Sequence, residues 1–295
     1  MAKLRDYPIA VDDLREYLAG YSDFSFELQT LKLIRDAGLQ CDHGGLYQDS
    51  ITKKTREFDI RAFVSIGKTS VRLPIECKNV RPNYPILVSR IPRHESESFH
   101  EVAYFVHLDS QDIVNVPAFR EKVKILRITG ADSRYKPGMP VGKNIVQVGR
   151  AWEKAGGIVD SDADVFDRWS QCLASANDLV EKTYWEESER EDLPSMAAVI
   201  PLLIVPNGHL WAVDYDSAGK LINEPTQIDS TSIFVNMQYS MGSPISEELL
   251  VSHLEVLTSN GLQQFINDSL TSATALQVIF PNHAVYAAMQ ALGIE

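Results

Sequence analysis

The chain has few cysteines and no long apolar run. Cys41, Cys77 and Cys172 are scattered through 295 residues, which excludes a disulfide framework and the spacing of a zinc knuckle. No apolar stretch approaches the length of a membrane span, and the first residues lack the apolar core of a signal peptide. Internal repeats and low-complexity tracts are also missing. We therefore expect a cytoplasmic protein with reduced thiols and no membrane contact.

Positive charge is scarce overall but concentrated in one segment. The net charge of −12 argues against a protein that coats nucleic acid with its whole surface. Residues 50–94 nevertheless hold ten Lys and Arg against three Asp and Glu, whereas the other 250 residues hold 18 against 37. Such a basic segment is typical of a localised phosphate-binding surface, although chance variation on a solvated surface gives the same pattern.

The remaining composition is that of an ordinary globular chain, with 44% hydrophobic and 23% charged residues. Apolar periodicity predicts an α/β fold. Helices are expected over 8–20, 23–37, 164–188, 245–257, 259–271 and 282–292, and strands over 39–47, 57–66, 70–78, 196–205, 210–214 and 231–237. Pro201 indicates an edge strand or a bulge, and the turn at 206–208 predicts a hairpin between the strands on either side of it.

Two of these segments, 57–66 and 70–78, read as strand, turn and strand. A two-residue turn at Gly67-Lys68 would place Asp59 opposite Glu76. A four-residue loop would instead place Asp59 opposite Lys78. Either loop puts the three side chains on one face of the sheet, because side chains alternate along a strand, whereas an odd loop or a bulge would separate them.

These three side chains suit one kind of chemistry. Two carboxylates on neighbouring strands repel each other, and a hard divalent cation such as Mg²⁺ relieves that repulsion through oxygen ligands. A lysine two residues from Glu76 can hold an anionic oxygen beside the metal. Together the groups favour metal-assisted hydrolysis of a phosphodiester bond. The Glu-x-Lys triplet alone is weak evidence, since a chain of this length contains about one by ordinary residue usage.

The order of elements resembles the core of the PD-(D/E)XK nuclease superfamily: a helix with a glutamate, a strand, a strand with an aspartate, a strand with Glu-x-Lys, a helix and a strand. The resemblance covers 23–78 by motif and 164–205 by element order only. It implies a restriction-endonuclease-like core over 1–216, a central mixed sheet flanked by helices, with an insertion at about 79–145. Residues 217–295 are expected as a β/α elaboration packed on the same domain.

The resemblance also implies roles for individual residues. Asp59 and Glu76 would bind the metal together with the backbone carbonyl of Cys77, and Lys78 would be the lysine of the signature. Glu27, on the helix over 23–37, would be the accessory glutamate, acting directly or through a water. Its helix carries the apolar positions Phe24, Leu28, Leu31 and Ile34, and this stripe extends to Glu27.

The chain departs from the family pattern at two places. The residue before Asp59 is Phe58 rather than proline. A glutamine-x-x-x-tyrosine pattern of one branch is missing, since Gln171 is followed by Ser175 and Gln147 by Ala151. The subfamily therefore stays open.

Each assignment has a plainer alternative. Asp59, Glu76 and Lys78 could form an ion-pair ladder with Arg61 on a solvated sheet face, and Glu27 could complement the helix dipole. Asp49 could reach a metal, but capping of a turn is favoured. The Cys77 thiol should pack in the core on the opposite face. The residues that could contact phosphate, or remain surface charges, are Arg61, Arg81, Lys53 and Lys54.

The expected function is Mg²⁺- or Mn²⁺-dependent endonucleolytic cleavage of DNA, and no feature of the sequence separates DNA from RNA. The family often cuts two strands as a dimer, so a homodimer is a second expected partner, although no heptad or apolar patch indicates one. One alternative is a catalytically silent nuclease-fold module that binds nucleic acid or a protein partner. Another is a binding protein that works mainly through residues 206–295.

Overall fold

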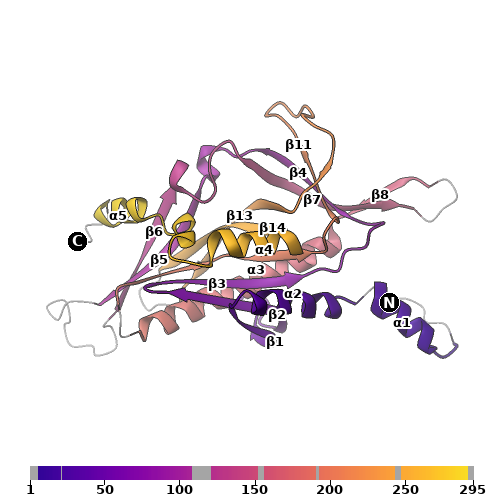
Figure 1. Ribbon diagram of the computed structural model, residues 1–295, viewed down its shortest axis with the longest axis horizontal. Helices are drawn as coiled ribbons and strands as arrows, with labels where there is room; N and C mark the ends of the chain where they lie inside the picture. The colour runs from indigo at the N-terminus through magenta and orange to yellow at the C-terminus, as the bar shows by residue number, and fades with distance from the viewer. Residues whose placement is uncertain are drawn as a thin grey trace.

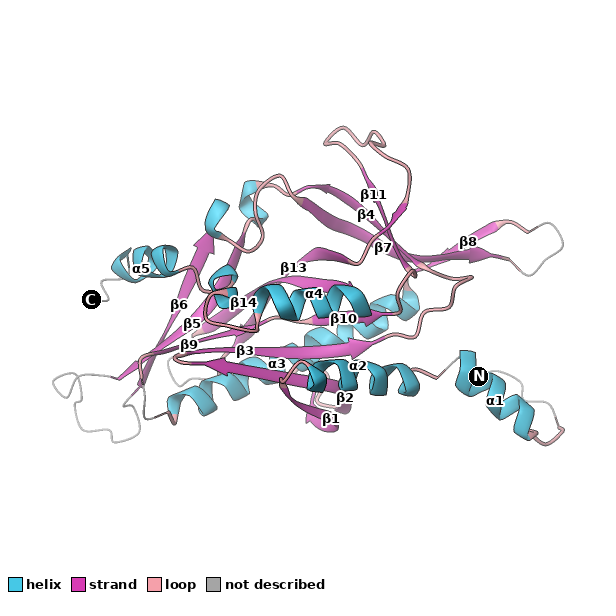
Figure 2. Ribbon diagram, viewed as in Figure 1, coloured by secondary structure: helices cyan, strands magenta, loops and turns pink. Residues whose placement is uncertain are grey.

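The helices and strands assemble into an α/β fold around one mixed sheet (Figures 1 and 2). A computed structural model describes residues 6–20, 22–107, 121–151, 156–190, 193–242 and 247–291. Its helices are α1 (Val11–Gly20), α2 (Phe24–Asp36), α3 (Ala163–Ser188), α4 (Ser259–Ser269) and α5 (Asn282–Ala291). Its strands are β1 (Gln40–Gln48), β2 (Thr55–Ile66), β3 (Thr69–Cys77), β4 (Ile86–Pro92), β5 (Phe99–His107), β6 (Glu121–Thr129), β7 (Pro140–Arg150), β8 (Ile158–Ser161), β9 (Ser195–Val199), β10 (Leu202–Val205), β11 (Leu210–Asp214), β12 (Thr226–Gln227), β13 (Ser230–Ser240) and β14 (Glu248–Thr258). The α/β class and the large mixed sheet are as the sequence predicts.

Strand β3 is the point at which the sheet divides. On one side it pairs antiparallel with β2, which in turn pairs with β1. On the other side β9 lies parallel to its first half and β10 lies parallel to its second half. From β9 the sheet continues to β5 and β6, and from β10 it continues to β14, β13, β7, β4, β11 and β12. Residue 76 therefore lies in the interior of the sheet, where carboxylates are rare.

The turn between β2 and β3 decides between the two registers that the sequence allows. Gly67 and Lys68 form the turn, with Gly67 at φ +59° in the left-handed region that such hairpin turns require. Ile66 pairs with Thr69, and the register runs without a shift to Ile60 opposite Ile75. The next pair in that register is Asp59 opposite Glu76, as a two-residue turn predicts.

Helix α2 packs on the sheet with a different stripe from the one predicted. Its buried residues are Phe26, Thr30, Leu31 and Ile34, whereas Phe24 and Leu28 are exposed. The helix ends at Asp36, one residue before the predicted end, and Gly38 turns the chain away at φ +84°. Glu27 follows Phe26 and so still points to the sheet side of the helix.

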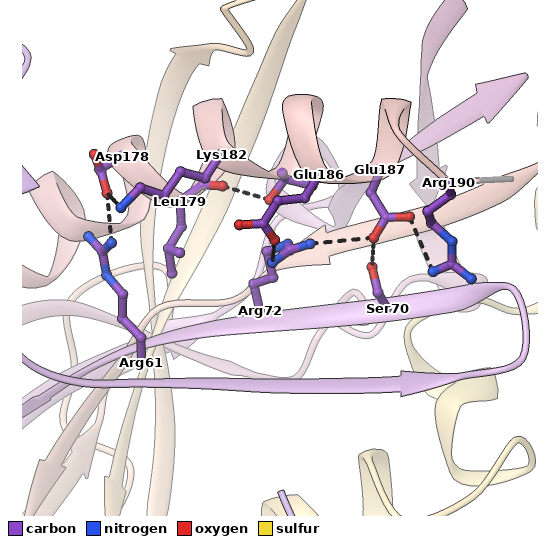
Figure 3. A network of polar contacts seen from close by, with 10 residues as sticks. Arg61, Ser70, Arg72, Asp178, Leu179, Lys182, Glu186, Glu187 and Arg190 are labelled. Atoms are coloured by element: carbon purple, nitrogen blue, oxygen red, sulfur yellow. Dashed lines mark hydrogen bonds and ion pairs between the residues drawn. The ribbon is translucent and has the colours of Figure 1, made fainter. Parts of the chain in front are cut away.

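Helix α3 covers the opposite face and is held there by buried ion pairs (Figure 3). Arg61 Nη1 lies 2.7 Å from Asp178 Oδ2, and the guanidinium also donates to Ser175. Its carbon lies 4.2 Å from the centroid of the Phe58 ring. Arg61 is 7% exposed. The expectation that Arg61 contacts phosphate or lies on the surface is therefore corrected: it fastens α3 to β2.

A second arginine, Arg72 on β3, repeats this arrangement two turns further along α3. It lies 2.5 Å from Glu186 and 3.5 Å from Glu187. Glu187 is 1% exposed and also accepts hydrogen bonds from the hydroxyls of Ser70 and Ser195, at 2.7 and 2.9 Å. Glu187 thus joins α3 to both β3 and β9.

The predicted helix over 245–257 is wrong, because this segment forms strand β14. Its apolar residues alternate with His253 and Glu255, and all of these are buried between β13 and β10. A strand buried on both faces has no polar side, so its periodicity resembles that of a buried helix. The helices predicted over 259–271 and 282–292 are confirmed as α4 and α5.

Two predictions around Pro201 are also wrong. The run over 196–205 lies inside the sheet rather than at its edge, and it is broken at Pro201 into β9 and β10. On the side away from β3, the neighbouring strand is β5 before the break and β14 after it. The missing N–H of Pro201 therefore interrupts neither the pairing of β9 with β5 nor that of β10 with β14. Gly208 turns the chain at φ +77°, yet β11 pairs with β4 and β12 rather than with β10, so the predicted hairpin does not form.

The segments outside the predicted core extend the same sheet. Residues 79–145 supply β4 and β7 on one side of β3 and β5 and β6 on the other. Residues 217–295 supply β13 and β14, which pair with each other between β7 and β10. The C-terminal segment is therefore central to the sheet. In the described ranges, no helix has the length and apolar character that crossing a bilayer requires.

Two buried histidines make the stability of the fold depend on pH. Burial of the ring is the main reason that the pKa of His100 falls to about 4 and that of His253 to about 2, from 6.5. Below pH 6.5 the unfolded chain therefore binds more protons than the folded chain does. The contribution of His100 and His253 to the free energy of unfolding is fully present above pH 6.5 and decreases as the pH falls below that value.

We expect His253→Phe to reduce the decrease in the free energy of unfolding that occurs as the pH falls. Each imidazole should lower the free energy of unfolding by about 1.4 kcal/mol per pH unit below its ordinary pKa. Phenylalanine keeps a ring against Tyr135, whose centroid lies 3.6 Å from that of His253, but it binds no proton. Between pH 7 and pH 5 the variant should lose about 2 kcal/mol less than the wild type. Urea unfolding at each pH measures this, and equal losses would contradict the assignment.

Candidate active site

The side chains of Asp59 and Glu76 meet between β2 and β3. Their carboxyl groups are close enough for the charge of Asp59 to raise the pKa of Glu76. The backbone N–H of Cys77 donates to Asp59 Oδ2 at 2.8 Å, which fixes the aspartate across the end of the hairpin. The two acids predicted to face each other are therefore brought together.

Glu76 is the more unusual of the two acids. It is 1% exposed, and neither of its carboxylate oxygens accepts a hydrogen bond from any described residue. Burial is the main cause that raises the pKa of Glu76 well above its ordinary value, and the charge of Asp59 is the second cause. Burial also raises the pKa of Asp59, against the hydrogen bond from Cys77. A buried carboxylate without a donor is destabilising unless a cation or a proton compensates it.

A third carboxylate approaches from α2. Burial and the charge of Asp59 raise the pKa of Glu27, and its charge contributes in turn to the raised pKa of Glu76. Glu27 Oε2 lies 3.5 Å from His43 Nε2 on β1. Three acids from α2, β2 and β3 thus share one electrostatic environment, as the resemblance implies.

The cation beside these acids is Arg168 on α3, which the sequence analysis did not select. Its Nη1 lies 3.9 Å from Glu76 Oε2, and its Nη2 lies 2.5 Å from Asp23 Oδ2. Asp23 also accepts the N–H of Asn79 at 2.8 Å. A signal for Arg168 was present, since it stands three residues after Val165 and four before Cys172, inside the apolar stripe of α3.

Lys78 does not take the place beside Glu76 that Arg168 takes. Its backbone N–H donates to the carbonyl of Ile204 at 2.9 Å, which extends the pairing of β3 with β10 by one residue. Its side chain is half-buried, and the ammonium group makes no ion pair with any described residue. The structure therefore brings together Asp59 and Glu76, with Glu27 near enough to affect their pKa values but too far to complete a three-carboxylate metal site, and no ion pair joins Lys78 to them.

A cavity of about 400 Å³ opens beside Asp59 and Glu27. Arg168 and Gln171 form its wall on the α3 side, and Arg56 lines the opposite side. Arg56 lies 2.6 Å from Asp49, whose other oxygen accepts two backbone N–H groups of the turn between β1 and β2. The turn-capping role of Asp49 is confirmed.

The basic residues predicted to contact nucleic acid are dispersed. Lys53 and Lys54 are exposed in the turn between β1 and β2, Arg81 is half-buried after β3, and Arg61 is buried under α3. Cys77 is fully buried, so its thiol packs in the core beneath α2 as expected, and burial raises its pKa. The role of its carbonyl as a metal ligand stays a prediction.

The carboxylates of Asp59 and Glu76 suit a metal ion that keeps most of its water ligands. Within the described ranges, no three His, Cys, Asp or Glu side chains are close enough together to hold a metal ion. Mg²⁺ is commonly bound by one or two carboxylates and several waters, whereas zinc requires four protein or water ligands in a closed set. The two donor-free oxygens of Glu76 and the adjacent Asp59 therefore fit Mg²⁺ or Mn²⁺.

The chain matches no family model, no curated protein and no solved structure.

Proposed function

We propose that the protein is a Mg²⁺- or Mn²⁺-dependent endonuclease that hydrolyses DNA phosphodiester bonds. The observation that carries the proposal is Glu76, a buried carboxylate that has no hydrogen-bond donor and lies within the electrostatic influence of Asp59. The chain order α2, β1, β2, β3, α3 and then strands parallel to β3 supports a restriction-endonuclease-like core. The cavity would give a phosphodiester access to Asp59 and Glu27, which line it.

In this proposal the residues have distinct tasks. Asp59 and Glu76 hold the ion, and Glu27 orients a water from the α2 side of the cavity. The bound ion would lower the pKa of a water and polarise the phosphate. Arg168 offsets negative charge at the wall of the cavity, a task that the resemblance gives to Lys78. Arg56, with Lys53 and Lys54 in the adjacent turn, would meet the phosphates on either side of the scissile bond.

An activity screen tests the proposal. Supercoiled plasmid, linear duplex, single-stranded DNA, branched DNA and RNA are each incubated with Mg²⁺, Mn²⁺ or Ca²⁺. We expect cutting of at least one DNA form with Mg²⁺ or Mn²⁺, and its loss in Asp59→Asn. Absence of cutting in every combination, while the protein binds metal, would refute the proposal.

The second candidate is a nuclease-fold module without catalysis. Two observations favour it: Arg168 already compensates the acids, and Lys78 is not at the cavity. A module of this kind would show no Mg²⁺-dependent thermal shift, or an equal shift in Asp59→Asn. A shift that disappears in Asp59→Asn supports the metal-dependent enzyme instead.

Arg168 should compete with the metal for the acids. We expect Arg168→Met to bind Mg²⁺ at least about tenfold more tightly, since a charge about 4 Å from a carboxylate interacts with it by a few kcal/mol at an effective dielectric of about 20 and each 1.4 kcal/mol changes affinity tenfold. Isothermal titration of both proteins with MgCl₂ measures the change. Arg168→Lys keeps the charge and should bind as the wild type does. Unchanged affinity in Arg168→Met would contradict this role.

A further inference from the structure

A second cavity, of about 600 Å³, lies on the other face of the sheet from Glu76. Its lining residues Leu257 and Phe265 belong to the core beneath α2 and α4, whereas Glu76 faces α3. Among the described residues, none lines both this cavity and the one beside Asp59. Its volume is in the range of small-molecule sites.

Arg93 is the most informative residue of this cavity. It is 5% exposed and donates to Ser232 Oγ at 2.6 Å and to the carbonyl of Lys136 at 3.1 Å. Its Nε has no hydrogen-bond partner, and no described carboxylate forms an ion pair with it. A buried guanidinium is normally paired with an anion, because an unpaired charge in the interior is strongly destabilising.

Other polar groups converge on the same space. Ser232 lines the cavity and is 8% exposed, and its hydroxyl, which accepts a hydrogen bond from Arg93, can itself donate to a ligand. Arg134 lines the cavity with its guanidinium held by Glu255 at 3.0 Å and by Ser269 at 2.9 Å. Lys136 lies exposed at the cavity. The cavity thus offers a buried arginine without an ion pair, a buried serine hydroxyl and an exposed lysine.

The charge of the lining is positive in an acidic protein. Its charged residues are Arg90, Arg93, Arg134, Lys136, Glu255 and Asp268. Two of the basic residues, Arg90 and Arg93, belong to the basic segment over 50–94. Arg90 is paired bidentately with Asp214, at 2.7 and 3.0 Å, which leaves Arg93 and Lys136 for a ligand. An oxyanion with several acceptor oxygens matches an arginine, a lysine and a hydroxyl together.

We infer that this cavity binds a phosphate monoester of about the size of a mononucleotide, with the phosphate held by Arg93, Lys136 and Ser232. Phosphate offers enough acceptor oxygens for all three groups. The apolar residues of the lining, which include Leu257 and Phe265, would contact the organic part of the ligand. Asp268 would accept a hydrogen bond from a hydroxyl or amino group of that part.

Thermal unfolding and isothermal titration test the inference. The probes are AMP, inorganic phosphate and adenosine, at one ionic strength and in EDTA, so that the candidate metal site plays no part. We expect AMP to raise the melting temperature by roughly 3 °C or more at saturation, phosphate to raise it less, and adenosine to leave it unchanged. No stabilisation by AMP, or equal stabilisation by adenosine, would overturn the inference.

Three variants locate the site. Arg93→Met should abolish the AMP effect, and if it fails to fold, two milder variants decide the question. Lys136→Ala removes an exposed charge, and Ser232→Ala removes a hydroxyl with little change in volume. Each should weaken AMP binding about fivefold or more, whereas Lys220→Ala, an exposed lysine away from the cavity, should not. AMP binding that both milder variants leave unchanged would refute the proposed site.

Discussion

Glu76→Gln should abolish metal-dependent cleavage and at the same time stabilise the metal-free protein. Cleavage should fall by about a thousandfold or more, because a neutral amide is a poor ligand for Mg²⁺ and one of two acidic ligands is lost. In EDTA the free energy of unfolding should rise by roughly 1 kcal/mol, since the amide can donate to Asp59 where two carboxylates now repel each other. Plasmid cleavage and urea unfolding at pH 8 measure the two effects.

Glu57→Gln is the matched control for Glu76→Gln. Glu57 is exposed, lines the cavity beside Asp59 and belongs to the same hairpin, but it does not contact the acids. It should change cleavage and stability little. If Glu76→Gln retained full cleavage, the assignment of the metal site would be wrong. If it lost cleavage and also lost stability, Glu76 would be a structural acid instead.

Glu187→Ala should destabilise the fold by about 3–5 kcal/mol. The substitution leaves the hydroxyls of Ser70 and Ser195 without their acceptor in the interior and removes one of the two partners of Arg72. Both serines are at most 1% exposed, so water does not replace the lost acceptor. Thermal and urea unfolding measure the loss.

The neighbouring glutamate is the matched control for this prediction. Glu186 binds the same arginine at 2.5 Å, but its side chain is 56% exposed, against 2% for Glu187. Glu186→Ala should therefore lower the free energy of unfolding by less than about 1 kcal/mol. The double variant should lose more than the sum, because Arg72 then has neither partner. Equal losses from the two single variants would contradict the role given to burial.

Local features of the sequence were sufficient for part of the site. The turn residues Gly67 and Lys68 and the alternation along β2 and β3 predict that Asp59 and Glu76 lie on one face. Apolar periodicity predicts α2, α3, α4 and α5, and Gly38 marks the end of α2. These features depend on neighbours within a few residues, so they can be predicted without the rest of the chain.

Other features depend on which segments pair across the sheet. The segment over 248–258 forms a strand because β13 and β10 lie on either side of it, and its apolar pattern alone fits a helix equally well. Arg61 appears in the sequence as one of ten basic residues, and only its contact with Asp178 on α3 shows that it is buried.

The sequence alone determined the α/β class and the placement of the two acids on one face of the hairpin, because both follow from local periodicity. It left two registers open, and the structure decided between them. Tertiary structure decided that Arg168 rather than Lys78 lies beside those acids, and that Arg93 and Ser232, 139 residues apart by number, share a cavity on the other face. The physical reason is that the neighbours of an arginine or lysine side chain depend on how α3, α4 and the central strands pack together. The spacing of residues along the chain does not encode that packing.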